Sequence, residues 1–331
     1  MRKQRSLAGD GEPVVGPRSG LESPRYAGLG TFARLPLLEQ VPRWDVAVLG
    51  IPFDSGVSYR PGARFGPASV RQASRLLRPY DQDLKIEPFA VQQVVDAGDC
   101  DCTPFNIEEA VTQIQTRAMD LLKLGSNIVA IGGDHTIALP MLRAVRARFG
   151  SVAVVHFDAH LDTWDTYFGA PYTHGTPFRR ASEEGLIDLQ RSMHVGVRGS
   201  IYSPSDLEDD SRLGFTIIPA SDFDRLTIDE VALKIRRRVG DAPVYVSVDV
   251  DVMDPSHAPG TGTPEAGGLT SRELLGTLRR LGGCRVVGAD VVELAPPYDV
   301  AEITAVAAAH LVYCLLGLLG QSRRGVASQI S

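Results

Sequence analysis

The chain has 331 residues, of which 44% are hydrophobic and 22% charged, and its formal net charge is −6. This composition predicts a soluble globular protein with a substantial core, and the lack of a broad basic field argues against nucleic acid as a partner. The four cysteines, Cys100, Cys102, Cys284 and Cys314, are too few for a disulfide framework, so we expect reduced thiols and a cytoplasmic location.

The two ends of the chain differ in character. Residues 1–20 are polar and rich in glycine and proline and lack the apolar segment of a secretory signal, so we expect a flexible arm. Residues 21–331 contain no low-complexity linker or internal repeat, which predicts a single domain. Near the C-terminus, Ala305 to Leu319 is strongly apolar but short for a membrane span and contains His310, so we expect a buried helix and no membrane partner.

Between these ends, short apolar runs alternate with helical patterns. The apolar runs predict strands at residues 45–49, 92–95, 127–131, 151–157, 194–197, 215–218, 244–250 and 285–292. Capping residues at Asn106, Thr227 and Thr270 indicate helix starts, and Gly125 and Gly240 indicate helix ends. Strands that alternate with helices predict a parallel sheet covered on both faces.

Four of the expected strands end in polar residues. These strand ends are Asp134-His135, Asp158 to Asp162, Asp249 to Asp251, and Asp290 to Glu293. In parallel sheets the ligand site lies at the carboxyl ends of the strands, so we expect these side chains to converge in space.

The segment after the fourth strand suggests a metal site. Asp158, His160 and Asp162 recur at every second residue, a spacing that places their side chains on one side of an extended chain. Groups of this kind repel one another unless a cation lies between them. The alternative for this segment alone is a strand end with solvated polar residues.

Residues from two other strand ends enlarge this group. With His135, Asp249 and Asp251 it comprises four carboxylates and two imidazoles. One divalent ion does not need so many anionic ligands, whereas two ions that share carboxylates do, and such a pair can activate water. Oxygen-rich ligation without a thiolate favours Mn²⁺ over structural Zn²⁺, although composition does not fix the metal.

Three segments of the chain resemble the signatures of the ureohydrolases, the family of arginase, agmatinase and the guanidino-acid hydrolases. They are Gly132 to His135, Phe157 to Asp162, and Ser247 to Pro264, and the resemblance covers about residues 24 to 320. It implies a three-layer α/β/α fold with an eight-stranded, mostly parallel sheet, two Mn²⁺ ions per subunit, and hydrolysis of a guanidinium group to urea and an amine. By analogy with the family we also expect a homo-oligomer, either a trimer or a hexamer.

The resemblance also implies roles for individual residues. Six positions resemble metal ligands: His135, Asp158, His160, Asp162, Asp249 and Asp251. Asp158 and Asp249 resemble the carboxylates that bridge the two ions. His135 and Asp162 resemble the other ligands of one ion, and the remaining two residues resemble those of the second. Because every position carries the expected residue type, a metal-free relative is disfavoured.

Two further residues suit the chemistry. Glu293 resembles the family's guanidinium-binding glutamate, since a carboxylate can orient the cation and hold its charge; the alternative is a surface salt bridge. His174 resembles the histidine that shuttles protons, because an imidazole can protonate a leaving amine; the alternative is a solvated loop histidine. We therefore expect Asp162, His174 and Glu293 to be catalytic, with Asp162 hydrogen-bonded to the nucleophile and the other two in contact with substrate.

The sequence says less about which guanidine is the substrate. Arginases resemble one another in a polar, Asn-containing stretch after the third ligand, whereas this chain has Thr163 to Phe168, so L-arginine is disfavoured. Agmatine ends in an ammonium group, which suits Trp164 or Asp165. A guanidino acid such as 4-guanidinobutyrate ends in a carboxylate, which suits Arg179 or Arg180, unless these arginines belong to the surface or a subunit contact.

We expect agmatine, hydrolysed to putrescine and urea, with a guanidino acid as the alternative substrate. A different class of function is a relative that binds a guanidine or polyamine without turnover. The complete set of expected ligands argues against that class, because an inactive relative would be free to lose them.

Overall fold

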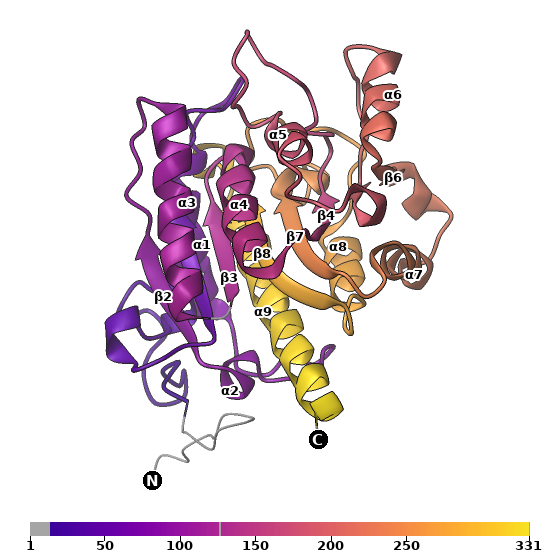
Figure 1. Cartoon of the computed structure of the whole chain (residues 1–331). Coiled ribbons are helices and arrows are strands. Elements are labelled where there is room, and N and C mark those ends of the chain that lie inside the picture. Colours follow the sequence, from indigo (N-terminus) through magenta and orange to yellow (C-terminus); the bar gives the residue numbers. More distant parts are fainter. Residues whose placement is uncertain (1–13, 126, 331) are drawn as a thin grey trace.

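The computed structural model describes residues 14–125 and 127–330, and its centre is an eight-stranded sheet (Figure 1). All neighbouring strands pair in parallel, in the order β2-β1-β3-β8-β7-β4-β5-β6. The strands are β1 (Val46–Ile51), β2 (Val94–Asp99), β3 (Asn127–Gly132), β4 (Ala153–Phe157), β5 (Met193–Val195), β6 (Thr216–Ile218), β7 (Pro243–Asp249) and β8 (Arg285–Val292). The expected strands are therefore confirmed, with shifted ends, and the sheet is wholly parallel.

Helices cover both faces of this sheet and complete the three-layer α/β/α fold. They are α1 (Gly66–Ala73), α2 (Pro88–Val91), α3 (Ile107–Leu124), α4 (Ala138–Phe149), α5 (Pro177–Glu183), α6 (Pro204–Leu213), α7 (Ile228–Val239), α8 (Ser271–Arg279) and α9 (Ile303–Ile330). In Figure 1, α3, α4 and α5 lie over one face, and α1, α8 and α9 lie behind the other.

Side-chain alternation along the strands divides the core into two parts. In β1, Val46 and Val48 belong to the core beneath α9, whereas Ala47 and Leu49 belong to the core beneath α3 and α4. Both parts are buried because a parallel sheet with helices on each face has no solvated side. The near-continuous apolar composition of the strands follows from this arrangement.

The helix ends follow the capping signals in the sequence. The Asn106 side chain accepts a hydrogen bond from the Glu109 backbone at the start of α3, at 3.0 Å. Reciprocal capping boxes begin α7 at Thr227 and α8 at Thr270. Gly125 and Gly240 cap the C-termini of α3 and α7, as expected.

Three helices were not anticipated. Each begins with a proline at its first position, Pro88 in α2, Pro177 in α5 and Pro204 in α6. Helix α6 buries only Asp210, so it has no apolar stripe whose period could indicate a helix. Its remaining signal is the capping box between Ser203 and Asp206.

The apolar C-terminal segment is part of the core. Within α9, the stretch Ile303–Arg323 is long and apolar enough to span a membrane, with a mean hydropathy of 2.0, but 83% of that window is buried inside the fold. Such burial is typical of the core helix of a globular protein, in agreement with the expectation from the sequence.

Most of the expected N-terminal arm, residues 1–20, lies outside the described residues. The described part begins at Val14, and Val15 exchanges two backbone hydrogen bonds with the Gln93 side chain, at 2.8 and 3.0 Å. Farther along, the Arg34 guanidinium donates to the Arg18 carbonyl at 2.7 Å. These contacts tie residues 15–18 to the body of the protein.

Candidate metal centre and substrate cavity

The strand order brings four polar strand ends together. Strands β3, β8, β7 and β4 are consecutive neighbours at the centre of the sheet. His135 follows β3, Asp158 follows β4, Asp249 ends β7 and Glu293 follows β8. The convergence expected from the parallel fold is therefore present, although the strands come from distant parts of the sequence.

Close backbone contacts hold these strand ends in place. A Cβ atom on Gly133 would lie 1.8 Å from the Phe53 carbonyl oxygen, so only glycine fits at this crossing. The Glu293 backbone N–H donates to the Gly133 carbonyl at 2.8 Å, and the Glu293 carboxylate accepts from the His135 backbone N–H at 2.9 Å. Glu293 (φ 65°) and Asp162 (φ 54°) are both in the left-handed region, a strained backbone that often marks a functional site.

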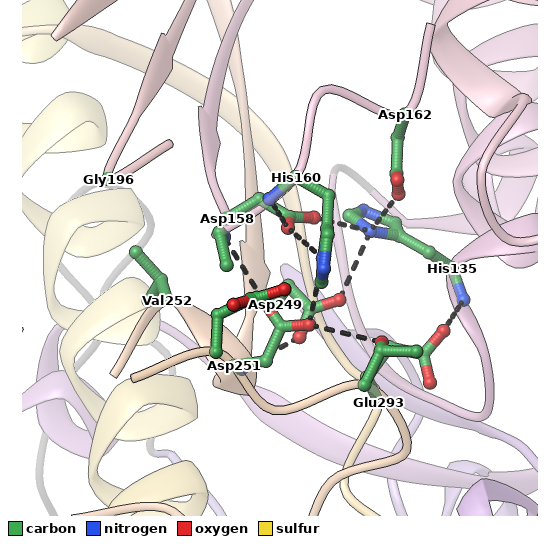
Figure 2. A network of polar contacts seen from close by, with 12 residues as sticks. His135, Asp158, His160, Asp162, Gly196, Asp249, Asp251, Val252 and Glu293 are labelled. Carbon is green, nitrogen blue, oxygen red and sulfur yellow. Dashed lines mark hydrogen bonds and ion pairs between the residues drawn. The ribbon is translucent and has the colours of Figure 1, made fainter. Parts of the chain in front are cut away.

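The first group of possible metal ligands comprises His135, His156, Asp158 and Asp162. The His135 Nδ1 atom lies 2.9 Å from Asp162 Oδ2, 3.2 Å from Asp158 Oδ2 and 3.4 Å from Asp249 Oδ2 (Figure 2). Despite these short distances, the buried Nδ1 has no partner in hydrogen-bond geometry. A nitrogen that faces three carboxylates without a hydrogen bond fits a position where a cation would be held.

The second group comprises Asp158, His160 and Asp251. The His160 Nδ1 atom lies 3.2 Å from Asp158 Oδ1 and 3.1 Å from Asp251 Oδ2. The two oxygens of Asp158 thus face different histidines, as Figure 2 shows, so this carboxylate is common to both groups. Asp249 borders the first group, and its bridging role stays a prediction.

A buried hydrogen-bond chain fixes the orientation of the His135 ring. Its Nε2 atom lies 2.8 Å from the Ser247 hydroxyl, which donates to Asp290 at 2.6 Å. The Tyr245 hydroxyl donates to the other oxygen of Asp290, also at 2.6 Å. Because Nε2 donates into this chain, Nδ1 is left with its lone pair toward the carboxylates, which is the tautomer of a metal ligand.

The carboxylates of the site destabilise one another without a cation. Burial and the nearby Asp251 and Asp158 raise the pKa of Asp249 well above its ordinary value. Burial and Asp158 raise the pKa of Asp251 to about 6, and they also raise the pKa of Asp162. Two divalent ions would neutralise this charge, so the donor set fits the metal centre that the sequence suggests.

The remaining catalytic candidates form a pair beside the metal ligands. His174 Nδ1 lies 3.0 Å from Glu293 Oε1, and its Nε2 lies 2.8 Å from the Ser58 hydroxyl and 3.1 Å from the Ser58 backbone nitrogen. Burial lowers the pKa of His174, but the carboxylates of Glu293, Asp162 and Asp134 together outweigh it and raise that pKa to about 9. The Ser58 hydroxyl can accept a hydrogen bond from Nε2 when the His174 ring is charged. The Ser58 backbone N–H can donate to Nε2 when the ring is neutral, so Ser58 can bind both protonation states.

A cavity of about 270 Å³ opens onto His160, Asp162 and His174. Its outer wall includes Trp164, Tyr167 and Tyr202. The rings of these three residues contact one another edge to face, with centroids 5.6 to 6.0 Å apart. Ser58, Ser200, Thr263 and Glu265 complete much of the wall, and among the described residues it includes no lysine or arginine.

Of the residues expected to select the substrate, only Trp164 lines the cavity. Trp164 lines the cavity and donates from its indole to Asp206 at 3.2 Å. Asp165 does not line it, since this side chain is 65% exposed and forms an ion pair with Arg180. Arg179 is also outside the wall and pairs with Glu183 on its own helix, at 2.7 Å. Neither arginine lines the cavity, although the Arg180 side chain is only 14% exposed.

Several residues of the site were not singled out in the sequence. The aromatic wall adds Tyr167 and Tyr202, and the acidic wall adds Glu265. Only Tyr167 has a sequence signal, since it lies in the segment after the third expected ligand. Tyr202 and Glu265 come from loops that meet the site only in the folded chain.

Comparisons with known proteins agree with this geometry. A model of the arginase family matches residues 44–317. The chain is 44% identical to a guanidinopropionase of Pseudomonas aeruginosa, over 92% of this chain and 96% of that one, and 41% identical to an agmatinase of Chromobacterium violaceum, over 89% of each. The solved structure of proclavaminate amidino hydrolase from Streptomyces clavuligerus superimposes with a TM-score of 0.87 at 44% identity, over 91% of this chain and all of that one.

Replacement of Asp158 by asparagine should release metal from both groups, because both use this carboxylate and an amide carries no charge. We expect the affinity for Mn²⁺ to fall about 100-fold or more, beyond the 10–100-fold typical of residues that only support a ligand. Metal content after gel filtration, measured by plasma mass spectrometry, checks this. Asp165→Asn is the matched control, since Asp165 is exposed outside the cavity; metal retention by Asp158→Asn equal to that control would contradict the assignment.

Metal retention should also depend on pH. The pKa of Asp251 is raised to about 6. Above that pH the carboxylate is ionised and can bind a metal ion, and as the pH falls below about 6 it takes up a proton. Protons then compete with the metal, and we expect the bound metal to be lost between about pH 7 and about pH 5. Dialysis against buffers across this range, followed by metal analysis, tests the direction; metal content that rises as the pH falls is the opposite result.

Proposed function

Because this chain belongs to the arginase family and is a hydrolase of guanidino compounds, we propose that it cleaves agmatine to putrescine and urea. The observation that carries the choice of agmatine is the cavity wall, whose described residues combine aromatic rings with the Glu265 carboxylate and include no basic side chain other than histidine. The proposed reaction uses residues that line this cavity together with Glu293, which contacts the lining residue His174.

The six ligands expected from the sequence would hold two divalent ions, and we propose Mn²⁺. Support comes from the oxygen-rich donor set and from the free Nδ1 of His135, which faces three carboxylates. When bound, such a pair of ions lowers the pKa of a water molecule and supplies the nucleophile.

Glu293 orients the guanidinium group for attack. Its Oε1 atom is held by the His135 backbone N–H and by His174, whereas its Oε2 atom is buried without a hydrogen-bond partner. A buried carboxylate oxygen without a partner is costly unless a ligand satisfies it, and a guanidinium N–H is a suitable donor. The strained backbone of Glu293 holds this oxygen in place before the substrate arrives.

Asp162 and His174 handle protons on either side of the reacting carbon. Asp162 lies in the cavity wall beside the other expected metal ligands, where its carboxylate can accept a hydrogen bond from the nucleophile. His174 is charged at neutral pH because its pKa is raised to about 9, so it can donate a proton to the amine that leaves. The amine departs protonated, and the products are urea and the cationic amine.

The part of the cavity that binds the far end of the substrate decides whether a cationic or an anionic group is accepted there. The ammonium group of agmatine suits the ring faces of Trp164, Tyr167 and Tyr202, because aromatic groups arranged as a cage bind alkylammonium ions. Glu265 adds a negative charge to the same wall. A terminal carboxylate would face these groups without a basic partner among the described lining residues.

A guanidino acid is the second candidate substrate. The 44% identical guanidinopropionase and the structural neighbour named proclavaminate amidino hydrolase, by their names, act on guanidino compounds that are acids. For such a substrate, the hydroxyls of Ser58, Ser200 and Thr263 would bind the carboxylate in place of an arginine. The choice between the two substrates thus depends on the sign of the charge that the outer cavity prefers.

Urea release from a panel of guanidines tests the proposal. With Mn²⁺ supplied, we expect the highest kcat/KM for agmatine, and lower values for 4-guanidinobutyrate, 3-guanidinopropionate and L-arginine. Glu265→Gln should raise the KM for agmatine about 10-fold and improve the acids relative to it, because a negative charge is lost from the wall. A higher kcat/KM for a guanidino acid than for agmatine, left unchanged by Glu265→Gln, would refute agmatine as the substrate. The absence of urea with every guanidine in the panel would refute hydrolysis.

The role of His174 has a separate test. His174→Ala should lower kcat by about 10²–10⁴-fold, the range for a lost general acid, without lowering the metal content. The matched control is His257→Ala, because His257 lies outside the cavity wall and its ring contacts the Ser271 hydroxyl. Loss of metal in step with loss of activity would show that His174 supports the metal centre instead.

A further inference from the structure

A buried chain of polar residues runs from Asp158 away from the cavity. His156 Nε2 lies 2.8 Å from Asp158 Oδ2, and His156 Nδ1 lies 2.7 Å from His194 Nδ1. On its other side, His194 Nε2 lies 3.1 Å from Asp210 Oδ1, which also accepts from the Thr163 hydroxyl at 2.9 Å. His156, His194 and Asp158 are fully buried, and Asp210 is 1% exposed.

The donors and acceptors along these buried polar residues determine which ring nitrogens of His156 and His194 carry protons. Carboxylates accept hydrogen bonds, so the Nε2 atoms that face Asp158 and Asp210 must both carry protons. One of the two Nδ1 atoms that face each other must also donate. The two rings therefore share three N–H protons, and we assign the donating Nδ1 to His194, whose other nitrogen faces Asp210.

We propose that His194 and Asp210 are positioning residues for the metal centre, which hold His156 in the tautomer that donates to Asp158. The inference rests on the metal-dependent function proposed above. Neither residue lines the cavity, so the effect on the reaction is transmitted through Asp158.

The place of Asp158 explains why its orientation matters. Its Oδ1 atom accepts from the His160 backbone at 2.6 Å and faces the His160 ring, while its Oδ2 atom faces both His135 and His156. A rotation of this carboxylate would disturb both groups of ligands at once. The His156 donor opposes that rotation only while His194 donates to its other nitrogen.

The rings alone do not require this polar chain. Phe178 packs against His156 with centroids 4.3 Å apart, and Phe215 packs against His194 at the same distance. An apolar ring at position 194 could fill this space, and it would avoid the cost of burying polar groups. A connected chain of four buried polar groups that ends on a shared metal ligand instead indicates a role in orientation.

Two substitutions separate orientation from packing. His194→Phe keeps an aromatic ring between its neighbours but removes the donor, whereas His194→Asn keeps an amide donor at the position of Nδ1 but removes the ring. We expect His194→Phe to weaken Mn²⁺ binding about 10–100-fold, the range for residues that support a metal ligand, and His194→Asn to retain most of the affinity. Thermal stability should show the reverse order, because Asn leaves a cavity.

Affinity is measured on the full-length protein by competition for Mn²⁺ with a fluorescent chelator. Phe215→Leu is the matched control, since it changes the packing against His194 without removing a hydrogen bond, and it should bind Mn²⁺ like the wild type. Equal affinity of His194→Phe and the wild type, or an affinity that simply follows stability across the variants, would overturn the inference. No Mn²⁺ binding by the wild type would instead refute the proposed function.

A measurement on the unaltered protein applies even if a variant does not fold. The chain requires three ring N–H protons on His156 and His194, one of them on His156 Nε2, all protected from exchange by burial. Nitrogen-15 NMR of the histidine rings detects them in protein loaded with diamagnetic Zn²⁺, because paramagnetic Mn²⁺ would broaden these signals. A bare Nε2 on His156 would overturn the inference.

Discussion

The repulsion among buried carboxylates is the constraint on which the rest of the site depends. Asp158, Asp162, Asp249 and Asp251 lie close together with almost no exposure to solvent, and their neighbours raise the pKa of three of them. A protein gains nothing in stability from such a cluster, since each charge loses its hydration and meets others of the same sign. The arrangement is typical of a site for cations, and the surrounding fold must hold it together before they bind.

The fold achieves this through rigid neighbours on every side. The ligands project from the ends of central strands that are themselves buried, and backbone contacts such as the one at Gly133 leave little room for relaxation. Hydrogen-bond chains then fix the ligands from behind, through Ser247 for His135 and through His156 for Asp158. The candidate metal ligands are therefore held in place before any cation binds, and Asp162 and Glu293 adopt left-handed backbone conformations among them.

The sequence was sufficient to predict the sheet and the clustering of aspartates and histidines at its edge, for a physical reason. Buried parallel strands must be continuously apolar, so the strand ends at Asp134, Asp158 and Asp249 stand out as abrupt changes to polar residues. The outer cavity has no such rule. Asp165 and Arg179 lie near Trp164 in sequence but form surface ion pairs, whereas Tyr202 and Glu265 reach the cavity from distant loops. Tertiary proximity of loop residues leaves no periodic trace in a single sequence.

The order of the strands also bears on how the protein is made. The last strand of the chain, β8, lies between β3 and β7, so it joins two half-sheets, β2-β1-β3 and β7-β4-β5-β6. His135 belongs to one half, and Asp158, Asp249 and Asp251 belong to the other. A chain that still lacks β8 has no strand to join these halves, so the first group, which needs His135 from one half and carboxylates from the other, is incomplete at that stage. The second group, Asp158, His160 and Asp251, belongs to one half alone, so the proposed binuclear site would be completed only when β8 joins the halves.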